Sequence, residues 1–185
     1  NKITDKNQRE ILLLKSFACS YGKCAFCNYI LDNSYDENEI NQINIDLLNK
    51  ITGEFGCLEI INSASVFELP LRTLEYIRKT ADEKNIKIIY FEVYFSYIKR
   101  LNEIINFFPN QEIRFKVGIE TFDNNYRTKI LKKNFLLNDY TQLSNFYSCC
   151  LLICTEAQTK EQISNDIETA LKYFKTLTLL LPSST

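Results

Sequence analysis

The sequence predicts an α/β domain built around a parallel β-sheet that is covered by helices. Three observations lead to this prediction: short apolar runs alternate regularly with longer amphipathic stretches, the apolar runs are nearly continuous, and no Gly- or Pro-rich linker interrupts the alternation. In such folds the chemistry lies at the carboxyl ends of the strands. The periodicity alone leaves an open doubly wound sheet and an incomplete barrel as alternatives.

Each predicted strand is a short apolar run bounded by polar residues. The first, 11–17, ends directly before a loop that contains three cysteines, and the fifth, 147–153, is itself rich in cysteine. The other four runs are 58–61, 86–91, 113–119 and 177–181. Their length and continuous apolar character are typical of strands buried on both faces.

Each predicted helix carries apolar residues three and four positions apart. The first covers 36–51 and the second 70–84, where Pro70 suits the first turn of a helix. The third covers 97–107 and ends before Pro109. The last three are expected at 124–131, 138–146 and 159–174.

The composition is that of an ordinary globular protein. Of 185 residues, 45% are hydrophobic and 24% are charged, with a formal net charge of −1. We therefore expect residues 1–185 to form a single domain. The sequence ends directly after an apolar run, which leads us to expect an incomplete C-terminus. Because acidic and basic residues are interspersed, we expect no direct contact with nucleic acid.

The residue types that are abundant or missing narrow the chemistry further. There is no secretory signal and no apolar run of the roughly 18–20 residues that a membrane span needs, so we expect a cytoplasmic protein without a membrane partner. Seven cysteines in such a chain indicate metal or redox chemistry rather than disulfides. The absence of histidine excludes Ser–His and Cys–His nucleophiles and His-based zinc hydrolases.

The loop after the first strand carries three cysteines within nine residues, Cys19, Cys24 and Cys27. Thiolates are soft ligands that suit iron–sulfur clusters or zinc. Three thiolates leave one iron of a four-iron cluster without a protein ligand, which is what a substrate-binding cluster requires.

Four interpretations of this loop remain open from the residues alone. Free cysteines also pack in apolar cores. A structural zinc site would take a fourth ligand from Cys149, Cys150 or Cys154. The spacing with Cys57 thirty residues later also fits a plant-type [2Fe–2S] protein, although those folds have mostly antiparallel strands. The fourth interpretation is a radical enzyme.

Four segments, which span about two-thirds of the chain, favour the radical enzyme. They are 17–29, with Phe26 directly before the third cysteine, 59–67, 91–98 and 117–135. Together they resemble the archaeosine-lyase and elongator-type branch of the radical S-adenosylmethionine (SAM) superfamily. Two departures are a first cysteine gap one residue longer than the usual Cys-x3-Cys-x2-Cys and Asn134 in place of glycine. A small stand-alone chain of this pattern is most similar to the bacterial queuine lyases.

The resemblance implies a partial (β/α)6 TIM-like barrel with a [4Fe–4S] cluster on the three cysteines and SAM as the second cofactor. It implies a lyase that releases queuine from queuosine or queuosine 5′-phosphate by radical cleavage of the base–ribose C–N bond, in queuosine salvage for tRNA modification. The alternative is another small radical SAM enzyme that acts on a 7-deazaguanine or nucleotide. An iron–sulfur electron carrier is the more distant third. The expected partners are a nucleoside or nucleotide and an electron donor of the flavodoxin or ferredoxin type.

The resemblance also implies roles for residues at the strand ends. Glu92 is expected to read the N–H edge of a deazaguanine base, with an ion pair to Arg or Lys as the alternative. We expect Cys149, Cys150 and Cys154 to pack rather than to bind an auxiliary cluster, with Cys150 and Cys154 on one face of their strand. The residues expected at SAM are Phe26 and Tyr29 beside the adenine, Asn62, Ser63 and Ser65 at the methionine ammonium group, Glu120 and Thr121 at the ribose or substrate, and Arg127 or Lys133 at a carboxylate or phosphate.

Overall fold

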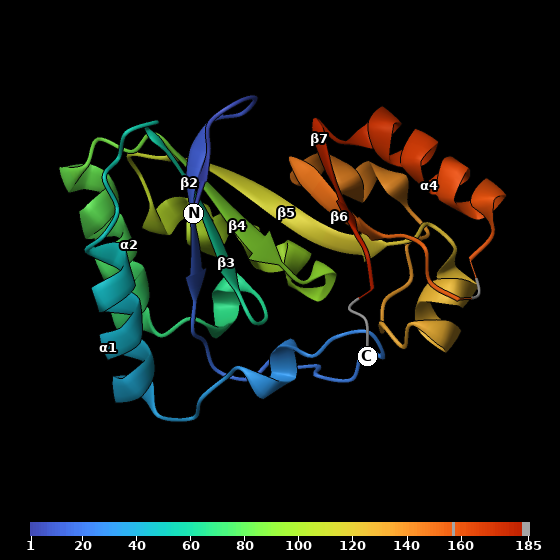
Figure 1. Cartoon of the computed structure of the whole chain (residues 1–185), viewed down its shortest axis with the longest axis horizontal. Coiled ribbons are helices and arrows are strands. Elements are labelled where there is room, and N and C mark those ends of the chain that lie inside the picture. The colour runs from blue at the N-terminus through green and yellow to red at the C-terminus, as the bar shows by residue number, and fades with distance from the viewer. Residues whose placement is uncertain (157, 183–185) are drawn as a thin grey trace.

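The computed structural model describes residues 1–156 and 158–182 and shows one curled, seven-stranded sheet (Figure 1). Its strands lie side by side in chain order, and all neighbours from the second strand onward are parallel. A doubly wound sheet would reverse its strand order at a switch point, so the order identifies a partial (β/α) barrel. The six parallel strands are β2 (Arg9–Leu14), β3 (Cys57–Asn62), β4 (Ile88–Val93), β5 (Glu112–Glu120), β6 (Ser148–Leu152) and β7 (Thr176–Leu180).

Four α-helices connect these strands: α1 (Glu37–Leu48), α2 (Leu71–Glu83), α3 (Leu101–Phe107) and α4 (Lys160–Tyr173). The Asp36 side chain caps α1 by accepting from two backbone N–H groups, and Thr159 begins α4 with a capping box. Figure 1 shows α1 and α2 together outside β3, and α4 beside β6 and β7. None of the helices within the described residues is long and apolar enough to cross a membrane.

The structure confirms the six predicted strands and differs from the prediction in short elements. Strand β1 (Lys2–Ile3), antiparallel to β2, was not predicted because two residues carry no periodicity. The segment 97–107 divides into η3 (Phe95–Arg100) and α3, while 124–131 contains the π-helix η4 (Tyr126–Ile130) and 138–146 the 3-10 helix η5 (Tyr140–Asn145). Pro70 is the N-cap residue of α2 rather than part of its first turn.

The two faces of the sheet have opposite character. On the outer face, Ile60, Phe91 and Ile119 are buried under the helices in one apolar core. Successive side chains on a strand point to opposite faces, so their neighbours in sequence face the concave side. Those neighbours include Glu59 and Glu120, both buried. A row of charged side chains therefore lines the interior of the partial barrel.

Candidate active site

A cavity of about 240 Å³ lies at the carboxyl ends of the parallel strands. It brings together most of the predicted site residues from five separate segments. Only Ser65, Thr121 and Arg127 of the predicted set lie outside its lining. The predicted residues that line it are Cys19, Cys24, Phe26, Cys27, Tyr29, Asn62, Ser63, Glu92, Glu120 and Lys133.

The three cysteines of the loop are free and half-buried on one side of this cavity. Backbone contacts anchor the loop: the Ala25 N–H donates to the Leu131 carbonyl at 2.9 Å, and the Cys27 N–H donates to the Cys24 carbonyl at 3.3 Å. Burial raises the pKa of Cys24 to about 11, against the opposing effect of the Lys133 ammonium group. A metal bound to these sulfurs would displace their protons.

The three thiols of the loop line one cavity. No group of three or more metal-ligating side chains converges on one point in residues 1–156 and 158–182. A cluster takes each thiolate on a different iron, so its ligands need not converge on one point. Cys57 begins β3, at the amino ends of the strands, away from this loop. The plant-type [2Fe–2S] interpretation therefore lacks its fourth ligand at this site.

Polar groups at the carboxyl end of β3, Asn62 and Ser63, face the same cavity. The Asn62 side-chain amide donates to the Ser65 carbonyl at 2.9 Å, while its Oδ1 is buried and has no hydrogen-bond partner among the described residues. Ser63 shares a hydrogen bond of 2.9 Å with Ser16. Ser65 points elsewhere, because its hydroxyl caps the 3-10 helix η2 (Val66–Glu68). An unpaired buried acceptor is costly, so Asn62 Oδ1 is suited to a donor such as an ammonium group.

Glu120 and Lys133 form a buried ion pair of 2.6 Å at the carboxyl end of β5. Glu120 lies at an irregularity of the β5–β6 register and has a φ of 64°, an unusual value for glutamate. A Cβ on Gly118 would contact the Glu120 carboxylate and lie 2.6 Å from Lys133 Nζ, so a side chain at this position would displace the two charged groups. Burial lowers the pKa of Lys133, but Glu120 outweighs it and the pKa is raised.

Aromatic rings surround the ammonium end of Lys133. Its Nζ lies 5.7 Å from the ring centroid of Phe26 and 5.8 Å from that of Tyr94. Tyr29 also lines the cavity and is 56% exposed. Phe26 and Tyr29 are thus placed where a planar ring could stack at the entrance.

Thr121 and Arg127 hold the backbone after β5 and do not reach the cavity. Arg127 is fully buried, and its guanidinium donates to the carbonyl groups of Ile119, at 3.0 Å, and Thr121. It also donates to the Asn124 side chain at 2.6 Å, and burial lowers its pKa to about 10. The side chain is fully buried and each of its three nitrogens donates to the protein, so the structure gives Arg127 a role in the fold instead of the ligand contact expected from the sequence.

We expect Arg127→Met to lower the free energy of unfolding by about 2–4 kcal/mol, because buried carbonyl groups lose their donors. Equilibrium urea unfolding measures this change. The affinity for SAM at a temperature where the variant is folded should stay within about twofold of wild type. A large loss of SAM affinity in the folded variant would restore the ligand role.

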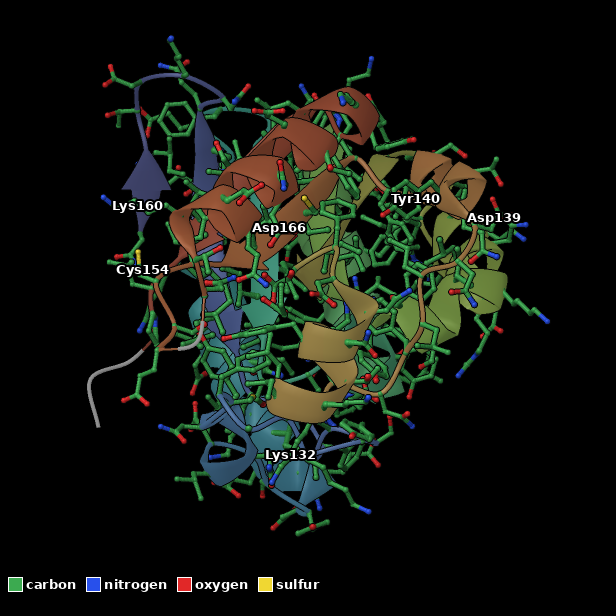
Figure 2. The ribbon with its side chains drawn as sticks, turned by 90° about the vertical axis from the view of Figure 1, so that its right-hand side faces the viewer. Lys132, Asp139, Tyr140, Cys154, Lys160 and Asp166 are labelled. Carbon is green, nitrogen blue, oxygen red and sulfur yellow. The ribbon has the colours of Figure 1, made fainter. Side chains whose placement is uncertain are left out.

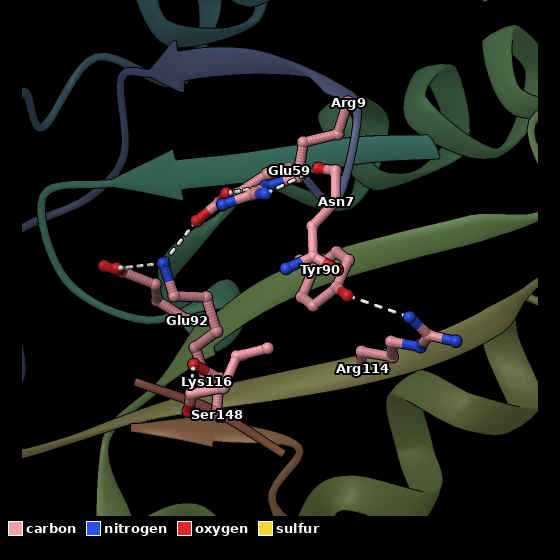
Figure 3. A network of polar contacts seen from close by, with 9 residues as sticks. Asn7, Arg9, Glu59, Tyr90, Glu92, Arg114, Lys116 and Ser148 are labelled. Carbon is pink, nitrogen blue, oxygen red and sulfur yellow. Dashed lines mark hydrogen bonds and ion pairs between the residues drawn. The ribbon is translucent and has the colours of Figure 1, made fainter. Parts of the chain in front are cut away.

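Glu92 projects into the cavity from β4 and lies 3.8 Å from Lys116 Nζ. Lys116 in turn donates to Glu59, whose other oxygen accepts from Arg9 Nε at 2.5 Å (Figure 3). Burial raises the pKa of Glu92. The ion pair that was the alternative for Glu92 is therefore present, but its long distance leaves the carboxylate open to the cavity.

The cysteines of β6 and the following loop diverge. Cys149 is buried in the apolar core, as predicted, whereas Cys150 lines the cavity, where burial raises its pKa to about 12. Cys154 lies beyond the end of β6, is exposed, and sits at the edge of the molecule in Figure 2. Alternation therefore did not place Cys154 with Cys150, because the strand ends at Leu152. Three cysteines so dispersed do not surround a second cluster.

Several residues that line the cavity were not predicted from the sequence, notably Tyr94, Lys116 and Gly118. Lys116 and Gly118 lie on the predicted strand 113–119 and share the face of Glu120. Two-residue alternation counted back from Glu120 would have identified both.

No protein-family model and no curated protein sequence matches the chain. The chain matches, over its whole length, a solved structure of a queuine lyase from Clostridium spiroforme bound to SAM and queuine. The TM-score is 0.95 at 44% sequence identity, and the match covers 100% of this chain and 80% of that chain. Identity at this level over the full chain, on the same fold, establishes kinship. The chain belongs to the queuine lyase family of radical SAM enzymes.

Proposed function

We propose that the protein is a radical SAM lyase that releases queuine from queuosine or queuosine 5′-phosphate by cleaving the base–ribose C–N bond. The observation that carries the proposal is the single cavity that joins the three-cysteine loop to a carboxylate, Glu92, on the inner face of the barrel. The matched structure, which has SAM and queuine bound, supports the same reading. The reaction would serve the salvage of queuine for tRNA modification.

Cys19, Cys24 and Cys27 would hold a [4Fe–4S] cluster, and SAM would lie between that loop and the ends of β3 and β5. Together these cofactors supply a 5′-deoxyadenosyl radical, and the protein supplies binding, orientation and the exclusion of water. The Asn62 Oδ1 and Ser63 oxygens are placed to accept from the SAM ammonium group. Lys133 is suited to a carboxylate, and the free Glu120 Oε2 to a ribose hydroxyl.

Glu92 is the residue best placed to read the base. A deazaguanine presents two adjacent N–H donors, and one carboxylate can accept both when it is ionised. The Glu92 carboxyl group lines the cavity, and the ion pair with Lys116 lies on one side of it. A negative group there also rejects bases that present acceptors at that edge.

We expect Glu92→Gln to weaken queuine binding by about 10- to 100-fold, because an amide accepts less strongly and places N–H donors against the N–H donors of the base. Isothermal titration calorimetry with queuine measures the loss. The matched control is Glu112→Gln on the neighbouring strand, where the carboxylate is solvent-exposed and outside the cavity. Equal affinities for wild type and Glu92→Gln would remove Glu92 from base recognition.

The proposed substrate is a nucleoside or nucleotide rather than intact tRNA. A net charge of −1 gives little long-range attraction to a polyanion, and phosphate-backbone binding depends on clustered basic residues. We further propose a flavodoxin- or ferredoxin-type electron donor and a reducing cytoplasmic setting, the latter on the strength of seven free cysteines.

Anaerobic turnover tests the proposal directly. The reconstituted protein is incubated with SAM and dithionite, with and without queuosine 5′-phosphate, and the products are separated by chromatography. We expect 5′-deoxyadenosine in both reactions and queuine only with the nucleotide. Formation of 5′-deoxyadenosine without queuine would favour a radical SAM enzyme for another deazaguanine substrate. Absence of both products would contradict an enzymatic role, and cleavage of tRNA alone would overturn the choice of substrate.

A further inference from the structure

Four side chains of alternating charge cross the interior of the barrel from the amino ends of the strands to the cavity. Arg9 pairs with one oxygen of Glu59, Lys116 with the other, and Lys116 also lies 3.8 Å from Glu92 (Figure 3). The residues come from β2, β3, β5 and β4. Only Glu92, the last member, has been given a role in the proposed function.

Lys116 lines the active-site cavity. It also lines a second, polar cavity of about 100 Å³ on the other side, together with Asn7, Arg9 and Tyr90. The side chain is 7% exposed, so little solvent screens its charge. Within the described residues, Lys116 is the one cation whose ion pair with Glu92 is shorter than 4.0 Å.

The groups that face Glu92 come from every neighbouring element. They are Glu59 on β3, Lys116 and Glu120 on β5, Lys133 after η4, Cys150 on β6 and Tyr29 on η1 (Tyr29–Leu31). Burial and the two carboxylates oppose the ionisation of Glu92, and the two lysines favour it. Lys133 is committed to Glu120 at 2.6 Å, which leaves Lys116 as the nearer source of positive charge.

We propose that Lys116 is a positioning residue that keeps Glu92 ionised and directed into the cavity, and thereby sets the pH range over which the enzyme binds the base. The inference rests on the proposed function, because it assigns Lys116 to the recognition of the same ligand. Arg9 and Glu59 hold Lys116 in place. One oxygen of Glu59 accepts a hydrogen bond from the Lys116 ammonium group, and the other accepts from Arg9.

Lys116→Met gives a signature that a loss of packing alone does not. Without Lys116 the pKa of Glu92 rises, and the protonated acid cannot accept both N–H groups of the base. We expect queuine binding at about pH 7 to weaken about tenfold or more, and to return to within about threefold of wild type near pH 9. In wild type the same gain should be complete at a lower pH than in Lys116→Met, and Lys116→Arg should behave like wild type.

Arg114→Met is the matched control. Arg114 is the previous inward-facing cation on β5, but it pairs with Glu112 and Tyr90 and is absent from the active-site cavity. The Arg114→Met substitution removes the same charge from the same strand and should leave the pH profile of queuine binding unchanged. If Lys116→Met folds poorly because Glu59 keeps only Arg9, the double variant Glu59→Gln/Lys116→Met removes that excess charge. This double variant should show the same rise of queuine affinity with pH, with a smaller amplitude.

The ionisation of Glu92 is also measured without a ligand. Infrared difference spectra across the same pH range should show a protonated-carboxyl band in Lys116→Met that is absent from Lys116→Met/Glu92→Gln. A pH-independent loss of affinity and no such band would overturn the inference while the proposed function stands. Wild-type protein that neither binds nor releases queuine would overturn the proposed function instead, and the infrared band would still decide whether Lys116 controls Glu92.

Discussion

Replacing Cys24 with alanine is expected to abolish cluster binding and to lower turnover by about 1,000-fold or more, because the cofactors carry the radical chemistry. Cys24 lies between the other two thiols in the loop, and all three line one cavity. With only Cys19 and Cys27 left, a second iron of the cluster lacks a protein ligand, and the cluster becomes labile. Iron and sulfide analysis of the anaerobically reconstituted protein measures the first effect, and the yield of 5′-deoxyadenosine measures the second.

Wild type should bind about four iron and four sulfide per chain, as one [4Fe–4S] cluster requires. Cys154→Ser is the matched control, since Cys154 is exposed and outside the cavity. It should leave iron content and turnover unchanged. About eight iron per chain, or a loss of iron in Cys154→Ser, would indicate an auxiliary cluster and contradict the assignment of Cys149, Cys150 and Cys154 to other roles.

The fold could be predicted from the sequence because each parallel strand is a continuous apolar run. What the periodicity could not decide was the closure of the sheet, since strand order is a property of non-local pairing. The strand pairing in the structure shows the order, from Glu10 beside Leu58 on β2–β3 to Cys149 beside Leu177 on β6–β7. The π-helix η4 was beyond prediction, because an α- and a π-turn share the same local apolar pattern.

The candidate site was predictable where strand ends carry polar residues, as at Asn62 and Glu92. The errors concern which face of the sheet a side chain occupies at or just after a strand end. Alternation that directs Glu120 inward directs Thr121 outward, where its hydroxyl accepts from the Asp123 N–H at 3.2 Å. Cys150 was expected to pack in the core, but the same alternation places it in the cavity and Cys149 in the core. Neither cysteine can be assigned to the inner or the outer face of the sheet until a neighbouring strand has been placed.

Lys133→Met is expected to reduce both stability and cofactor binding, because it leaves the Glu120 carboxylate buried without its cation. Removing one partner of a buried ion pair lowers the free energy of unfolding by about 3–5 kcal/mol, which equilibrium urea unfolding measures. The same change removes the cation proposed for the SAM carboxylate, so we expect SAM affinity to fall by about 100-fold in equilibrium dialysis.

Lys132→Met separates these effects from a general loss of positive charge. Lys132 precedes Lys133 in the turn after η4, where it is exposed and outside the cavity (Figure 2). It should change stability by less than about 0.5 kcal/mol and leave SAM affinity unaltered. If Lys133→Met loses stability but binds SAM normally, Lys133 serves only to neutralise Glu120.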